Sequence, residues 1–166
     1  MDTTASAAPP AGTRRSLRFN TIDEAIAEAE RLAAAERAGG LSRCGNWTLG
    51  QALGHLATWA TYPFDGYPDR VRAPLPVRMI LGLMRNRILT RGMTSGVRIR
   101  GIPDGTLGIE PLDTEEGLRR FRSAFERLKS RCPEIVNPVF GKLTHEQWMQ
   151  LNLRHAELHM GFQLRR

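Results

Sequence analysis

The chain has 166 residues with 41% hydrophobic and 25% charged content, which is ordinary for one soluble domain that buries a hydrophobic core. No apolar stretch approaches the ~20 residues of a membrane span, and two isolated cysteines form no disulfide or zinc pattern, so we expect a cytoplasmic protein. The net charge of +7 is concentrated in Arg70–Arg100, which holds eight arginines and no acidic residue and therefore predicts an anionic partner.

The first eighteen residues predict a flexible tail ahead of a single domain at residues 19–166. They are rich in Ala, Pro, Thr and Ser and have no hydrophobic periodicity. The pair Arg14-Arg15 resembles the start of a twin-arginine export signal. Because the next segment is polar and acidic where such a signal needs an apolar stretch, we do not expect export.

Four segments carry the start signature of a helix, in which a cap residue is followed three positions later by Glu or Gln. The caps are Thr21, Thr48, Asp113 and Thr144. Apolar residues recur at helical spacing after each cap. We expect the first helix to end at Gly39-Gly40, the second at Pro63 and the third before Cys132-Pro133. The fourth is expected to continue to the C-terminus.

The segment between the second and third capped helices is less regular. Tyr62–Pro76 is rich in proline and glycine and predicts turns, whereas Val77–Thr90 predicts a short basic amphipathic helix. Val97–Arg100 is a candidate extended piece. The expected architecture is all-α, a four-helix bundle with an elaborated crossover between the second and third core helices.

Two of the four histidines lie one helical turn apart on the last predicted helix. His155 and His159 both fall in the apolar stripe of that helix, so they point into the protein interior. Buried imidazoles need a partner, and a divalent metal ion would supply one while favouring their neutral form. A pair of hydrogen-bonded core histidines is the alternative, and the spacing alone supports both interpretations equally. Glu157 points away from the pair, and His145 is expected at the surface.

His55 on the second helix is the candidate for a third metal ligand. It flanks the main apolar stripe of a helix that is apolar over most of its circumference. Polar or aromatic residues one turn from the three histidines are candidates to hydrogen-bond the ligands or to line a pocket, although ordinary positions at the edge of the core explain the polar ones as well. These residues are Gln51, Trp59, Asn152 and Gln163, with Trp59 the expected pocket wall.

Several sequence motifs resemble a known group of proteins. WTLGQALGHLATW around His55 and the C-terminal HAELHMGFQ resemble the DinB-like superfamily of metal-binding four-helix proteins. RRSLRFNTIDEAI, NWTLGQALGHLA and FGKLTHEQWMQL are similar to a DinB-like family of unknown function, and the resemblance covers nearly all of Arg14–Gln163. It implies a metal bound by His55, His155 and His159 with open coordination positions. Members of that family often carry a doubled histidine, but here Leu158 precedes His159.

The resemblance also implies classes of function. Characterised relatives in the superfamily include thiol-dependent transferases and isomerases, so we expect a metal-dependent thiol transferase or a hydrolase acting on a small, anionic or thiol-bearing molecule. Three imidazoles accept Zn, Ni or Fe, and the sequence does not choose among these metals. It offers no convincing general acid or base.

Two alternatives to an enzyme stay open. One is a non-catalytic bundle with a structural or vestigial metal site. The other is a binder of anionic ligands or surfaces through Arg70–Arg100, where the lack of lysines and aromatic residues argues against nucleic acid. A homodimer that shares an apolar helix face is also left open.

Overall fold

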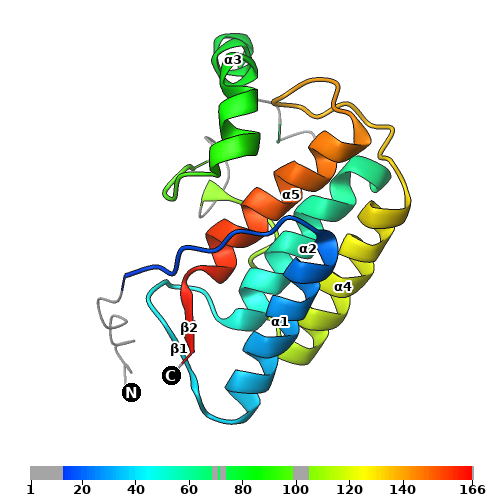
Figure 1. The fold of residues 1–166 in the computed structure, drawn as a ribbon. Helices are drawn as coiled ribbons and strands as arrows, with labels where there is room; N and C mark the ends of the chain where they lie inside the picture. The colour runs from blue at the N-terminus through cyan, green and yellow to red at the C-terminus, as the bar shows by residue number, and fades with distance from the viewer. Residues whose placement is uncertain (1–12, 69–70, 72–73, 99–104, 166) are drawn as a thin grey trace, which may run out of the picture.

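The computed structural model describes residues 13–68, 71, 74–98 and 105–165. Over these residues the protein is predominantly helical, with five helices and one two-stranded antiparallel sheet (Figure 1). The elements in chain order are α1 (Ile22–Arg37), β1 (Leu41–Arg43), α2 (Leu49–Asp65), α3 (Leu75–Arg91), α4 (Thr114–Ser130), α5 (His145–Met160) and β2 (Gln163–Arg165). No helix among them combines the length and the apolar content that crossing a bilayer requires.

The four predicted helix starts are confirmed. Thr48 and Thr144 form complete capping boxes, in which the threonine hydroxyl accepts from the backbone N–H three residues on and the glutamine there accepts from the threonine N–H. Thr21 and Asp113 accept from the corresponding N–H groups of α1 and α4. Local chemistry at the first turn thus fixes where each of these helices begins.

The predicted end of the second helix is wrong, because α2 continues through Pro63 to Asp65. Proline lacks an N–H, but so near the end of a helix it removes a single intrahelical hydrogen bond. The helix then closes with the Gly66 N–H, which donates to the Tyr62 carbonyl at 2.9 Å. The predicted turn region of Tyr62–Pro76 therefore begins only after α2 ends.

The last helix also differs from its prediction, since α5 ends at Met160 and does not reach the C-terminus. The Gly161 N–H donates to the Glu157 carbonyl, and the chain then enters β2. This strand pairs antiparallel with β1, with Gln163 opposite Arg43 and Arg165 opposite Leu41. Backbone pairing with a strand distant in sequence outweighs the helical tendency of the last residues, and a periodicity analysis of one segment cannot detect it.

The hydrophobic core lies among α1, α2, α4 and α5, which run side by side in Figure 1. The two helices α2 and α4 approach especially closely at a pair of glycines. A Cβ atom on Gly117 would lie only 2.7 Å from the Gly50 carbonyl oxygen, so hydrogen atoms in place of side chains permit this spacing. On another side α2 contacts α5, and the candidate site lies between these two helices.

Two of the predicted segments lie partly outside the described residues. The predicted tail at 1–18 lies largely outside them, and its remaining residues, 13–18, run along α5, where the Arg15 N–H donates to the Gly161 carbonyl at 2.8 Å. The candidate extended piece Val97–Arg100 lies partly outside them, and Val97 and Arg98 belong to no strand. The helix predicted at Val77–Thr90 is confirmed as α3, which contacts α5. The amphipathic character predicted for it is not confirmed, because Leu89 is its one buried residue and Val77, Ile80 and Met84 are exposed.

Candidate metal centre

Three histidine side chains from two helices converge at one point between α2 and α5. His55 lies midway along α2, and His155 and His159 lie one turn apart on α5. The Nε2 atom of His155 is 3.1 Å from the Nε2 atoms of both His55 and His159. One ligand atom from each of the three lies within 4.8 Å of the other two. The three predicted ligand residues are therefore brought together.

The orientation of the His55 ring is fixed by a backbone carbonyl. Its Nδ1–H donates to the carbonyl oxygen of Leu107 at 2.7 Å. Because a carbonyl can only accept, Nδ1 carries the proton in this contact, and the Nε2 lone pair faces the other two histidines. A hydrogen bond of this kind behind a metal-ligating histidine raises its basicity and holds its ring in place.

Burial keeps the three imidazoles neutral at neutral pH. It lowers the pKa of His55 to about 4, against the opposing effects of the Leu107 carbonyl and the negative charge of Glu110. Burial also lowers the pKa of His155 well below its usual value, with further contributions from the other two histidines. The pKa of His159 falls to about 3, first through burial and then through His55 and Arg14. Neutral imidazole is the form that binds metal ions.

The donor set fits a divalent cation. Zinc–nitrogen bonds of about 2.0–2.1 Å at tetrahedral angles place neighbouring ligand nitrogens about 3.3 Å apart, close to the 3.1 Å of the two short separations. Without a cation, the His155 Nε2–H would have to be shared between the lone pairs of the other two rings. Among the described residues, no carboxylate or thiol joins the three imidazoles in the cluster.

Two tryptophans border the cluster. Trp59, the predicted pocket wall, lies with its ring 6.1 Å from that of His55 and 6.4 Å from that of His155. Trp47, which the sequence analysis did not select, stacks on His159 at 4.9 Å with an angle of 10° between the rings. The buried Nε1 of Trp59 has no hydrogen-bond partner in the described part of the chain. The cluster thus has one aromatic wall from Trp47, just before α2 begins, and another from Trp59 within α2.

The polar residues predicted to hydrogen-bond the metal ligands instead bond to backbone groups. Gln51 closes the capping box of α2 and donates to the Ile109 carbonyl at 3.2 Å. Asn152 donates to the Trp148 carbonyl within α5. Gln163 lies on β2 and not on a helix, and it donates to the Trp47 carbonyl at 3.3 Å. Gln51 and Gln163 therefore hold the loop and the tryptophan beside the histidines.

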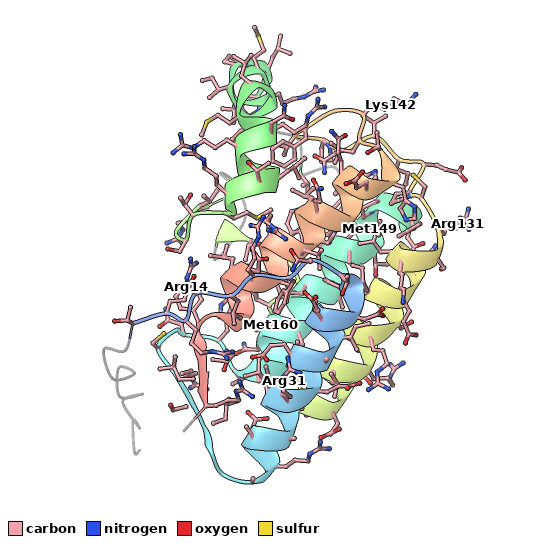
Figure 2. The ribbon with its side chains drawn as sticks, in the orientation of Figure 1. Arg14, Arg31, Arg131, Lys142, Met149 and Met160 are labelled. Carbon is pink, nitrogen blue, oxygen red and sulfur yellow. The ribbon has the colours of Figure 1, made fainter. Side chains whose placement is uncertain are left out.

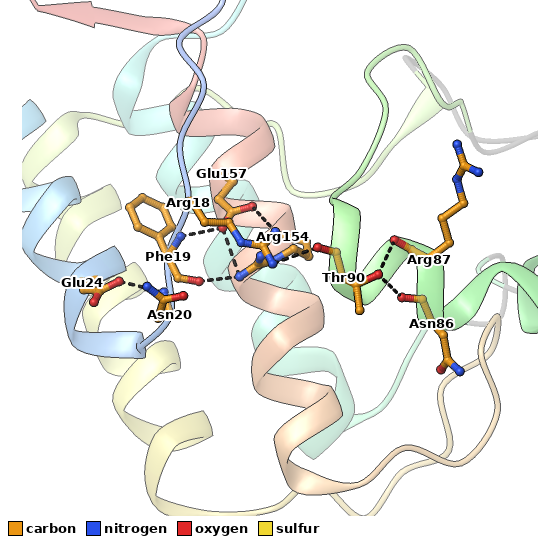
Figure 3. A network of polar contacts seen from close by, with 9 residues as sticks. All are labelled: Arg18, Phe19, Asn20, Glu24, Asn86, Arg87, Thr90, Arg154 and Glu157. Atoms are coloured by element: carbon orange, nitrogen blue, oxygen red, sulfur yellow. Dashed lines mark hydrogen bonds and ion pairs between the residues drawn. The ribbon is translucent and has the colours of Figure 1, made fainter.

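Glu157 and His145 were not expected to belong to the site. Glu157 is buried away from the histidine cluster, as expected, and accepts from the Phe19 N–H and from Arg154 (Figure 3). Burial raises the pKa of Glu157, so the loss of hydration outweighs the effect of its partners. His145 was expected at the surface, but it is half-buried, and its Nε2–H donates to the Leu128 carbonyl at 2.6 Å near the end of α4.

Two charged residues near the cluster have no signature in the sequence pattern. Glu110 lies close enough to raise the pKa of His55, and it contributes, after burial, to a raised pKa of Tyr62. Arg14 lies over the Phe162 ring, 5.6 Å from its centroid, and contributes to the lowered pKa of His159. Both residues belong to irregular segments, where hydrophobic periodicity carries no information.

The chain matches a family model over residues 11–166, and this family is described as "Protein of unknown function (DUF1569)". Because the match covers nearly the whole chain, the protein belongs to this family. Comparison of this chain with curated proteins found no match, and comparison with solved structures found none either.

Proposed function

We propose that this member of a family of unknown function binds one divalent metal ion through His55, His155 and His159 and acts as a metal-dependent transferase or hydrolase on a small molecule. The observation that carries the proposal is the convergence of three neutral imidazole nitrogens, two pairs of them 3.1 Å apart. Zn, Ni and Fe all accept such a donor set.

We further propose that the fold is a DinB-like four-helix bundle within one domain at residues 19–166. The support is the packing of α1, α2, α4 and α5 around one core, with α3 in the connection between the second and third of these helices. The placement of one histidine on the second core helix and two on the last agrees with the resemblance described above.

The surroundings of the cluster favour a small ligand with a thiol or an anionic group. His155 and His159 are partly exposed, so a ligand can reach the cluster from solvent. Trp47 and Trp59 provide apolar walls, and Arg14 brings a positive charge to the His159 side. When bound, a metal ion at such a place supplies Lewis acidity and lowers the pKa of a bound water or thiol.

Elemental analysis of the full chain, purified after expression in metal-replete medium, tests the proposed site. We expect close to one divalent ion per chain in the wild type and none after His155→Ala and His159→Ala are combined. His145→Gln is the matched control, because it removes a histidine outside the cluster and should leave the metal content unchanged. Full occupancy in the double variant, or an empty wild type, would contradict the proposal.

A non-catalytic metal site is the second candidate. The observation that favours it is the lack of a carboxylate or thiol among the clustered groups of the described residues, which leaves no evident general base there. Two measurements separate the candidates. Water-proton relaxation of protein loaded with a paramagnetic ion reports whether solvent reaches the metal, and a thiol-conjugation screen reports turnover. A closed, inactive site would support the structural role.

A further inference from the structure

Helix α3 carries most of the large apolar side chains that are exposed in the described part of the chain. Of the eight strongly exposed large hydrophobics among the described residues, six lie on this helix. They are Leu75, Val77, Met79, Ile80, Leu83 and Met84. An apolar surface concentrated in this way marks a contact site in a protein that is otherwise soluble.

The helix is attached to the protein body near its C-terminal end. Leu89 is buried there and Ile88 packs against the core, while the Arg18 side chain donates to the Thr90 carbonyl at 2.9 Å (Figure 3). The N-terminal part projects from the other helices, as the green helix does in Figure 1, and its side chains fan out into solvent in Figure 2. The exposed apolar residues are therefore held away from the core of their own chain.

The charge on this projecting helix is of one sign. It carries Arg78, Arg85, Arg87 and Arg91 and no acidic residue, and it lies within the acid-free block Arg70–Arg100. Its partner must therefore accept apolar side chains and offer negative charge within a few ångströms of them. A lipid bilayer with anionic headgroups has both properties at its surface.

The distribution of the apolar residues favours a bilayer over a second copy of the chain. At about 100° per residue, positions 75–84 place exposed apolar side chains over roughly 200° of the helix circumference, about twice the stripe that one packed partner covers. A symmetric contact between two α3 helices would also bring four arginines of each together, with no carboxylate on either helix.

We propose that α3 is a membrane-docking element, which places its apolar side chains at the surface of an anionic bilayer while its arginines contact lipid headgroups. The long aliphatic part of an arginine can lie along the apolar region while its guanidinium stays at the headgroups. The helix lies in the interface and does not span the membrane. This proposal is independent of metal binding, because none of the clustered histidines lies on α3.

Sedimentation of the full chain with lipid vesicles tests this proposal. We expect binding to phosphatidylcholine vesicles that contain phosphatidylserine, weak binding to phosphatidylcholine alone, and a decline of the first as salt is raised. Ile80→Gln should weaken binding severalfold, and adding Leu83→Gln should bring the loss to about tenfold or more. Val136→Gln is the matched control, since Val136 and Ile80 are both 58% exposed and only Ile80 lies on α3.

Charge variants provide an independent arm of the same experiment. Arg87→Gln should weaken binding about fivefold, whereas Arg43→Gln, which removes the same charge from the exposed last residue of β1, should leave it nearly unchanged. Failure to bind phosphatidylserine vesicles, or equal binding by the Ile80→Gln/Leu83→Gln variant, would overturn the proposal. A dimer in light scattering that this variant dissociates, without any lipid binding by the wild type, would assign the face to a second copy instead.

Discussion

Gly50, in the first turn of α2, lies where the helix meets the segment leading into α4. A Cβ atom added there would lie 2.1 Å from the Leu112 carbonyl oxygen and 2.7 Å from the carbonyl carbon of Asp113. Both contacts are with backbone, so no side-chain rotation can relieve them. The substitution Gly50→Ala therefore has to move α2 relative to the start of α4.

The expected magnitude combines two opposing effects. Extra atoms in a well-packed interior typically destabilise by about 1–3 kcal/mol and occasionally by more, and the contact here is at the severe end because it is with backbone. Alanine regains at most about 1 kcal/mol over glycine through helix propensity. We therefore expect Gly50→Ala to lower the free energy of unfolding by roughly 2–4 kcal/mol.

Urea denaturation followed by circular dichroism measures this change as a lower midpoint with an unchanged slope. Gly82→Ala is the matched control, because Gly82 lies in α3 with nothing within 4 Å of an added Cβ. It should leave the stability unchanged or raise it by up to about 1 kcal/mol. A Gly50→Ala variant as stable as the wild type would refute the close approach of α2 to α4.

Four further outcomes are expected, the third of them a control for the second. Trp47→Leu should weaken metal binding about tenfold in a competition titration, because the ring stacked on His159 is lost. Glu157→Gln should lower the unfolding free energy by about 3 kcal/mol, since it leaves the buried Arg154 without its counter-charge. Glu134→Gln, which breaks an exposed ion pair, should change it by less than about 1 kcal/mol. Chelation of the metal-loaded protein should lower its melting temperature. If the free metal concentration before chelation is a thousand times Kd, the free energy of unfolding should fall by about 4 kcal/mol.

Helix starts were predictable because the interactions that set them lie within four residues of sequence. The box formed by Thr48 and Gln51 requires nothing from the rest of the chain. The end of α5 was not predictable in this way. Gly161 is followed by residues that pair with Leu41–Arg43, and this pairing exists only once the chain has folded.

The candidate site was also predictable only where local sequence determines its geometry. The inward position of His155 and His159 followed from their place in an apolar stripe, whereas the third member of the cluster depended on family resemblance more than on helical position. The Leu107 carbonyl, which orients the His55 ring, lies in an irregular segment more than fifty positions away in the chain. A backbone carbonyl has no residue-type signature, so it can be found only from the fold.

Helix α3 shows why a stripe predicts burial only when something covers it. The helical spacing of apolar residues in Val77–Thr90 predicted the helix correctly, yet Val77, Ile80 and Met84 are exposed and Leu89 is the residue of α3 that the fold buries. In α5 the same rule predicted that two histidines point inward. That prediction was right because α2 packs against their face of the helix. Periodicity predicts that one face of a helix is apolar, but it does not predict what packs against that face. For α5 that partner lies in the same chain, whereas for α3 the arginines and the lack of acidic residues indicate an anionic surface outside it.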